Sequence, residues 1–428
     1  RTDGSIEFVA ENVPALGFKR YRAVVGQTDS WPSTVTATST TNTATVESQF
    51  YRVTINKTTG EVTSIVDKTA ANRELVNSAS AYKFNRTVKA KNLTDFLGGV
   101  PSTQSTATAT VTTRSGAVTG ALTVAYAPPG GGRQSSPISR IDITLYDKLK
   151  RIDVVDTFDR SRLTYTISVS DHSDHFYAPM PFNIGTAGLR TFIDGNAPVP
   201  LEPPTSTYLT GPTVTAVNNS DLPSRGITLR DQPASYEIQV VSPQVFWYVV
   251  GGNLNSYAYA PTEATIFGEC LVKQDRTQTD DPGQPEVDFV LEPLENNPSQ
   301  NYSTYVAQFS ITSGGARTAS AAGAFGSSVT APLQTAVVPG GQTGPITSSA
   351  LSFFSVDAPS VEILAVKRAE FGNTADTIVR VRERDGVAAS GTLRSAFAIQ
   401  SGSECNLLEN VTAPLAVPVP ITLAPHQT

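Results

Sequence analysis

Apolar and polar residues alternate over short stretches of this chain, which is the pattern of strands that bury one face. Tyr51, Val53 and Ile55 alternate with polar residues, and a second β-branched run follows at 62–66. The polar sequence Lys-Thr-Thr-Gly at 57–60 lies between the two runs, and its glycine can adopt a positive φ. The pattern predicts a β-hairpin that feeds a large sheet.

Further strands are predicted up to about residue 330, where no segment has a convincing helical period. A second hairpin is predicted from the alternating runs 141–145 and 151–155, which flank a polar turn. The nearly continuous apolar run within 239–250 predicts a central strand covered on both faces. Other strand candidates are 105–113 and 121–126. So many strands in one region predict an all-β fold with a very large sandwich.

Segments rich in Pro, Gly, Ser or Thr divide the chain. Residues 33–45 are almost entirely Ser, Thr, Ala and Asn, which indicates a linker or exposed loop with nothing to bury. The sequence VVPGGQTGPI at 337–346 prevents regular pairing and predicts a domain boundary. We therefore predict the end of a small β-module plus a linker in 1–45, a large β-supersandwich in 46–336, and a linker with a terminal β-sandwich in 337–428.

Composition narrows the function classes. The formal charge is -6 over 428 residues, with no basic patch, which argues against nucleic-acid binding. No apolar run approaches the ~20 residues of a membrane-spanning helix. Few lysines, one methionine and abundant threonine favour a secreted or cell-surface protein, or alternatively one of a lysosome- or vacuole-like compartment. Because the chain starts at Arg1 without an initiator methionine, we expect it to begin part-way through a longer or processed protein.

The sequence DHSDHFY at 171–177 is the densest cluster of candidate chemistry. His172, His175 and the two carboxylates are ligand types for a divalent metal. Histidines with this spacing on a strand point to opposite faces, however, so a shared metal would need a turn. Tyr177 and Phe176 could stack on a sugar ring. A plain polar loop is favoured over both; we predict no metal site and keep His172, His175 and Tyr177 as candidate carbohydrate contacts.

Other candidate sites are less specific. The acidic stretch 275–288 offers oxygens to calcium, but its spacing matches no EF-hand, and a solvated loop is favoured. The common nucleophile, zinc-helix and nucleotide-binding motifs are absent. A glycosidase needs two opposed carboxylates, and a chain with 38 acidic residues cannot be searched for that pair from sequence. We therefore nominate no catalytic residue.

Two kinds of covalent modification are candidates. Cys270 and Cys405 permit one disulfide or none. Asn-x-Ser/Thr sequons, which mark candidate N-glycosylation sites in a secreted protein, begin at Asn56, Asn85, Asn92, Asn218, Asn301 and Asn410. Since Ser and Thr are abundant, several such sequons would arise by chance.

Several segments resemble one family in the same order along the chain. They are ENVPALGFKRYRAV at 11–24, VESQFYRVTINKTTGEVTSIVDKTAANRELVN at 46–77, RIDVVDTFDR at 151–160, YAPMPFNI at 177–184, LSFFSVDAPSVEILAVKRAEFGNTADTIVRVRE at 351–383, CNLLE at 405–409 and ITLAPHQT at 421–428. These segments are similar to the C-terminal β-domain region of family-38 glycoside hydrolases, the α-mannosidase family. The resemblance is strong at both ends of the chain and thin at 80–140 and 185–340.

The resemblance implies an all-β fold: a large antiparallel, galactose-mutarotase-like supersandwich with smaller flanking β-sandwich modules. In the family, the zinc ligands and the nucleophilic aspartate lie in an N-terminal α/β domain that has no counterpart in this sequence. The resemblance therefore implies no cofactor in this chain, with zinc expected only in the absent catalytic domain. It implies carbohydrate as a ligand. The expected partner is the N-terminal catalytic part of the same precursor or complex, or further copies of the chain.

Two functions remain open at this stage. One is the non-catalytic C-terminal β-half of an α-mannosidase-like hydrolase, supporting retaining hydrolysis of α-mannosides that is carried out elsewhere. The alternative is a secreted carbohydrate-binding or cell-surface structural β-sandwich protein without hydrolase activity.

Overall fold

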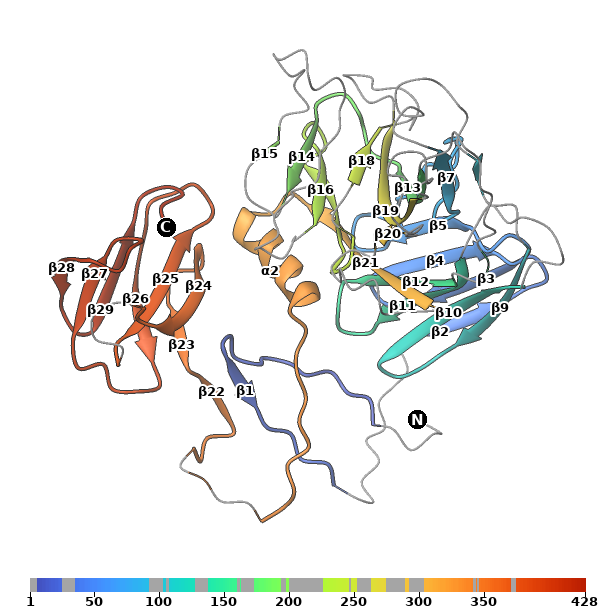
Figure 1. Cartoon of the computed structure of the whole chain (residues 1–428). Helices are drawn as coiled ribbons and strands as arrows, with labels where there is room; N and C mark the ends of the chain where they lie inside the picture. The colour runs from blue at the N-terminus through green and yellow to red at the C-terminus, as the bar shows by residue number, and fades with distance from the viewer. Residues whose placement is uncertain are drawn as a thin grey trace, which may run out of the picture. The chain divides into compact units, whose positions relative to one another are not determined.

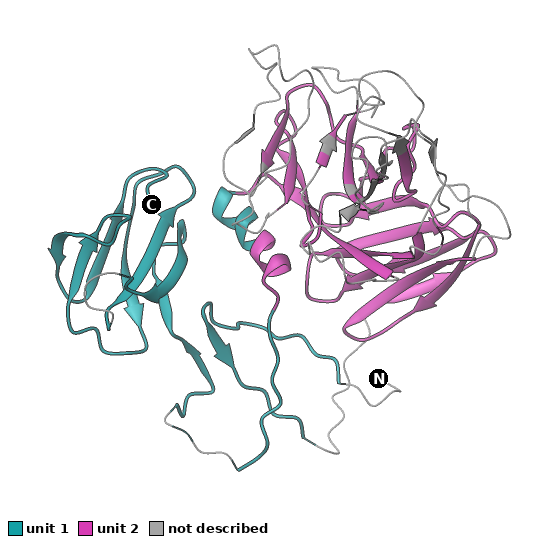
Figure 2. Ribbon diagram, in the orientation of Figure 1, with its two compact units in different colours: residues 1–30, 318–324, 333–428 teal, residues 31–317, 325–332 magenta. Residues whose placement is uncertain are grey.

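A computed structural model of the chain describes most of its residues, in several segments. The described residues are 6–24, 35–91, 103–104, 108–127, 138–159, 162, 173–193, 198–199, 226–245, 248–251, 263–274, 289–291, 304–341, 344, 346–370 and 375–428. They form two compact units, shown in Figure 2: a smaller unit of residues 1–30, 318–324 and 333–428, and a larger unit of residues 31–317 and 325–332. Each unit is described by itself.

The larger unit is built on three β-sheets (Figure 1). The first has nine strands in the order β15 (Pro198–Val199), β14 (Leu189–Ile193), β16 (Ile227–Asp231), β17 (Tyr236–Val241), β21 (Thr304–Gly315), β12 (Ile152–Asp159), β11 (Ile138–Tyr146), β10 (Thr119–Tyr126) and β9 (Ala109–Arg114). Its neighbouring strands are all antiparallel.

Two further sheets complete this unit. One has the order β18 (Tyr248–Val250), β19 (Ala264–Gln274), β13 (Ser173–Phe182), β7 (Val88–Lys91) and β8 (Thr103–Gln104), with β20 (Phe289–Leu291) also paired to β19. The other has the order β2 (Thr36–Ser39), β3 (Thr43–Glu47), β4 (Tyr51–Asn56), β5 (Val62–Asp67) and β6 (Arg73–Glu74). One continuous hydrophobic core joins residues of all three sheets, including Tyr51 of β4, Phe158 of β12 and Phe182 of β13.

The smaller unit consists of short strands around a small core. Its strands pair as β1 (Gly17–Lys19) with β22 (Ala350–Ser352), β23 (Phe354–Val356) with β26 (Ala389–Ser395) and β29 (Val419–Leu423), β24 (Val361–Arg368) with β25 (Thr377–Glu383), and β27 (Gly402–Cys405) with β28 (Val411–Leu415). The buried apolar cluster here contains Ala358, Val361, Ala389 and Leu423. Because these side chains are small, hydrophobic burial contributes less here than in the larger unit.

The structure confirms both predicted hairpins. β4 pairs with β5, and β11 pairs with β12, each in antiparallel register. Gly60, in the turn between β4 and β5, has a φ of 74°. A Cβ atom at Gly60 would lie 2.5 Å from the Tyr126 hydroxyl oxygen and 2.6 Å from Val124 Cγ1 of β10. Glycine is therefore required here both for backbone conformation and for close packing.

Three expectations are corrected. The predicted linker at 33–45 is wrong over its described part, because β2 and β3 form there and Val35 and Ala44 are buried. The expected absence of helix up to residue 330 is wrong, since α2 spans Ala319–Thr330. The single strand expected at 239–250 is two strands, β17 and β18, which belong to different sheets.

Among the described residues, no helix has the length and apolar character needed to span a membrane.

We predict that Gly60→Ala lowers the free energy of unfolding of the larger unit by about 1–3 kcal/mol, because alanine strains a positive φ and its methyl group meets Tyr126 and Val124. Urea unfolding followed by circular dichroism measures the change. The matched control is Gly315→Ala in the same unit, where a Cβ would meet nothing within 4 Å and φ is not positive. Equal stability of the two variants would contradict the interpretation.

Candidate functional site: a buried carboxylate network

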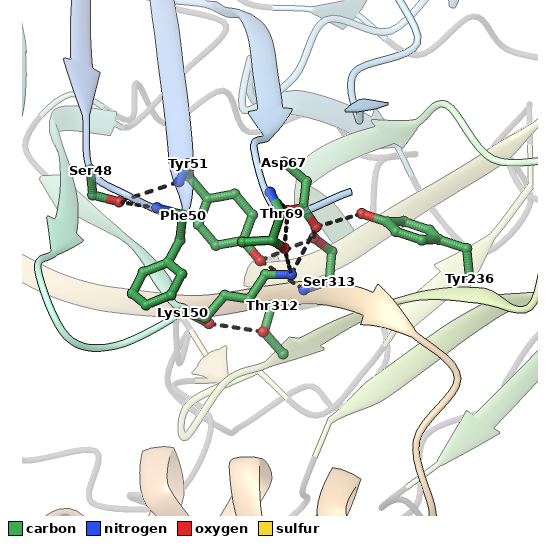
Figure 3. A network of polar contacts seen from close by, with 9 residues as sticks. All are labelled: Ser48, Phe50, Tyr51, Asp67, Thr69, Lys150, Tyr236, Thr312 and Ser313. Carbon is green, nitrogen blue, oxygen red and sulfur yellow. Dashed lines mark hydrogen bonds and ion pairs between the residues drawn. The ribbon is translucent and has the colours of Figure 1, made fainter. Parts of the chain in front are cut away.

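A polar network surrounds Asp67, the last residue of β5 (Figure 3). Its side chain is fully buried. The groups that contact it come from four places: Thr69 in the turn after β5, Lys150 between β11 and β12, Tyr236 in β17 and Ser313 in β21. The carboxylate therefore joins the five-stranded sheet to the nine-stranded sheet.

Five hydrogen bonds satisfy the two carboxylate oxygens of Asp67. Oδ1 accepts from the backbone N–H of Thr69 at 2.9 Å and from its hydroxyl at 2.7 Å. Oδ2 accepts from the Ser313 hydroxyl at 2.7 Å, the Tyr236 hydroxyl at 2.8 Å and the Lys150 ammonium at 3.0 Å. An ionised carboxylate is costly to bury unless it is paired and hydrogen-bonded, and this one is both.

A second layer of contacts orients these donors. The Tyr51 hydroxyl accepts from the Ser313 backbone N–H at 2.9 Å and lies 3.0 Å from the Ser313 hydroxyl oxygen. Since the Ser313 hydroxyl donates its proton to Asp67, the Tyr51 hydroxyl must be the donor to Ser313. The Lys150 ammonium lies 5.7 Å from the centre of the Tyr51 ring, a cation–π distance. Lys150 is further held through its carbonyl, which accepts from the Thr312 hydroxyl at 2.9 Å.

The protonation states follow from these contacts. Burial acts to raise the pKa of Asp67, but the hydrogen bonds from Thr69, Ser313, Lys150 and Tyr236 outweigh it and lower the pKa below its ordinary value. Burial raises the pKa of Tyr51 to about 12 and also raises that of Tyr236. At neutral pH the carboxylate is thus charged and both tyrosines keep their protons. A buried carboxylate with a lowered pKa and saturated oxygens is poorly suited to general acid or base catalysis, but it holds strands together.

Of the three candidate carbohydrate contacts, the structure describes the side chain of Tyr177 alone, so the candidate site stays a prediction. His172 lies outside the described residues. His175 lies in β13, where its backbone pairs with Val272 and Ala90, and its side chain is outside the described part. Tyr177 is also in β13 and is 1% exposed, which is the environment of a core residue. The described residues contain no group of three or more His, Cys, Asp or Glu arranged to hold a metal ion.

The sequons lie in different environments. Asn410 is exposed. Asn56 is half-buried, and its side-chain oxygen accepts from the backbone N–H groups of Thr58 and Thr59. Asn85 is 3% exposed, and the nitrogen that would carry a glycan donates to Asp156 at 2.9 Å. The candidate glycan site at Asn85 is therefore incompatible with this fold. Asn92, Asn218 and Asn301 lie outside the described residues.

The two cysteines belong to different units. Cys270 is buried in β19 of the larger unit, and Cys405 is half-buried at the end of β27 in the smaller unit. Their sulfur atoms are not bonded to each other in the structure. The disulfide stays a prediction that peptide mapping without reduction would test.

Comparison with known proteins begins with the smaller unit. Residues 360–427 match a family model described as the glycosyl hydrolases family 38 C-terminal beta sandwich domain. This matched segment includes β24 to β29 of the smaller unit. A search of curated proteins returns no match.

Solved structures resemble the chain over most of its length. An alpha-mannosidase from Enterococcus faecalis aligns with a TM-score of 0.56 and 13% identity, covering 89% of this chain and 41% of that one. A protein in the glycosyl hydrolase family 38 from Enterococcus faecalis aligns with a TM-score of 0.57 and 13% identity, covering 94% and 45%. A galactose mutarotase-like protein from Lactobacillus casei aligns with a TM-score of 0.36 and 12% identity, covering 65% and 100%.

The fold prediction is confirmed: the chain is nearly all β, with large antiparallel sheets and a smaller β-sandwich. The family 38 region predicted from sequence resemblance is confirmed for the terminal domain. The chain spans less than half the length of the two Enterococcus faecalis proteins that it matches.

We predict that Asp67→Asn lowers the free energy of unfolding of the larger unit by about 3 kcal/mol, because it removes the negative charge that compensates Lys150. Tyr236→Phe removes one hydrogen bond to a charged group and should cost about 1.5 kcal/mol. The double variant should lose less than the sum of the two, because both changes break the same contact. Urea unfolding of the four proteins measures the coupling, and strict additivity would contradict a shared network.

The contribution of Asp67 to the free energy of unfolding depends on pH with a defined sign. A carboxyl whose folded-state pKa is lowered contributes stability above its ordinary pKa of 3.8, and loses it as the pH falls through the folded-state value. The Asp67→Asn variant should therefore be less sensitive to acid than the parent protein over that acidic range. An unchanged acid-unfolding profile would show that Asp67 does not titrate as described.

Proposed function

We propose that this chain is the non-catalytic C-terminal β part of an α-mannosidase-like family 38 glycoside hydrolase. It would support the hydrolysis of α-mannosides by a catalytic domain that is not on this chain. The observation that carries the proposal is the family 38 domain at 360–427, at the end of a chain whose fold follows that of a larger alpha-mannosidase over 89% of its length.

The contacts of the buried carboxylates favour a structural role for this chain rather than a catalytic one. Asp67 accepts five hydrogen bonds, and Glu237 of β17 accepts from Arg230 and Arg317, so every oxygen of both carboxylates is already engaged within the fold. Both carboxylates are fully buried: Glu237 lies in the nine-stranded sheet, and Asp67 lies against that sheet at the end of β5. These charges fix the geometry of the sheets, which is what a rigid platform for another domain requires.

The catalytic domain would supply what this chain's described residues do not offer. The zinc that the family resemblance implies needs several His or carboxylate ligands in one place, and the described residues hold no such group. As the family resemblance implies, we assign the metal, the nucleophile and most of the carbohydrate contacts to that domain. Secretion, or delivery to a lysosome- or vacuole-like compartment, is part of the same proposal.

We predict that the purified 428-residue chain releases no aryl alcohol from an aryl α-mannoside above the uncatalysed rate, with or without added zinc. Mixed or co-expressed with the catalytic part of the protein it derives from, it should prolong the half-life of mannosidase activity on heating. The Asp67→Asn variant should prolong it less, whereas the surface variant Asp357→Asn in the smaller unit should behave as the parent chain.

Two results would contradict this proposal. Zinc-dependent turnover by the isolated chain would show that a catalytic site lies within it. A catalytic part that retains full activity and the same half-life without this chain would show that the chain does not support it.

A further inference from the structure

A carboxyl group lies in the apolar core of the larger unit at Asp156. Side chains alternate along β12, so Asp156 shares its face with Val154 and Phe158, both buried. Across the sheet, Asp156 pairs with Ile141 of β11 and Ala307 of β21. Asp156 is 0% exposed, so its carboxyl group is surrounded by apolar neighbours and has lost its hydration.

Its polar contacts differ sharply from those of Asp67. Oδ1 accepts one hydrogen bond, from the Asn85 side chain at 2.9 Å, and Oδ2 has no hydrogen-bond partner among the described residues. Asn85 itself has a φ of 57°, and its backbone N–H donates to the Pro179 carbonyl of β13 at 2.8 Å. The donor is thus fixed in place, and it is a neutral amide that cannot balance a negative charge.

The surrounding charges do not stabilise an ionised form. Burial, together with the negative charge of Asp142 on β11, raises the pKa of Asp156 to about 7 despite the hydrogen bond from Asn85. The Arg86 guanidinium donates to the Thr59 carbonyl. The Tyr126 hydroxyl of β10 donates to the same carbonyl. Burial and the negative charges of Asp156 and Glu61 raise the pKa of Tyr126 to about 12, against the positive charge of Arg86.

We propose that Asp156 is a pH-sensitive element of the fold: the protonated carboxylic acid is the form that the core accommodates, and ionisation weakens the seam between β12 and the segment that carries Asn85. The proton leaves to solvent, and the negative charge then has one hydrogen-bond donor among the described residues, the neutral amide of Asn85. The seam is therefore most stable in an acidic compartment. This inference does not depend on the proposed function.

The sign of the effect is opposite to that of Asp67. In the unfolded chain Asp156 ionises near its ordinary pKa of 3.8, whereas in the folded core it keeps its proton up to about 7. Between these values the folded state binds one more proton than the unfolded state. The unfolding equilibrium constant should therefore rise by about tenfold per pH unit over this range and level off above it.

The test compares urea unfolding of the parent chain, Asp156→Asn and Asp153→Asn from about pH 5 to about pH 8. Asp153 is the matched control: it lies on the same strand with its side chain on the other face, where it accepts from Arg151 at 2.9 Å and Ser310 at 2.6 Å. The ratio of the parent's unfolding constant to that of Asp156→Asn should rise with pH as stated. Asp153→Asn should keep the parent's pH slope.

A second measurement keeps the proposal testable if Asp156→Asn does not fold. The infrared spectrum of the native protein should contain the carbonyl band of a protonated carboxylic acid that disappears with a midpoint of about 7. Hydrogen exchange of peptides covering 84–91 and 152–159 should quicken over the same range by more than the base-catalysed rise in the intrinsic rate of amide exchange. Parallel pH slopes of the parent and Asp156→Asn, or a native protein without such a titrating band, would overturn the proposal.

Discussion

A buried negative charge at the end of β5 sets the geometry of the larger unit. The Asp67 carboxylate tolerates its position because five donors reach it, and those donors lie on β17, on β21, between β11 and β12, and in its own turn. If one of these segments shifts, a charge or a hydroxyl is left unpaired in a dry site, which costs far more than a surface hydrogen bond. The requirement for pairing therefore ties together sheets that hydrophobic burial alone would hold with less precision.

The smaller unit also contains a buried, hydrogen-bonded carboxylate, next to a smaller apolar core. Its core side chains are mostly alanine and valine, and Glu383 at the end of β25 is fully buried. The Glu383 carboxylate accepts from the backbone N–H groups of Asp385, Gly386 and His426, which fixes the turn after β25 and the C-terminal segment. A carboxylate that collects backbone donors supplies the order that a small hydrophobic core cannot.

Local pattern predicted the hairpins but not the network. β4–β5 and β11–β12 were predictable because alternation and a turn lie within a few residues. Strands β2 and β3 were not predictable, because threonine and alanine occupy both the exposed and the buried positions there. Helix α2 was not predictable, because its small residues form no apolar stripe. Pro243 is the signal that separates β17 from β18. The donors to Asp67 lie up to 246 residues away, beyond any periodicity.

Asp67 and Asp156 show how one fold uses two buried carboxyls in opposite ways. Asp67 is charged because its hydrogen-bond donors, including the Lys150 ammonium, lower its pKa by more than burial raises it. Asp156 retains its proton because the single hydrogen bond from the Asn85 amide does not offset the effect of burial on its pKa. Asp67 stabilises the fold at a pH above its lowered pKa, and Asp156 does so at a pH below its raised pKa. Both conditions hold together only under mildly acidic conditions. The pairing of strands in this unit therefore depends on pH through both carboxyl groups, with its greatest stability in that range.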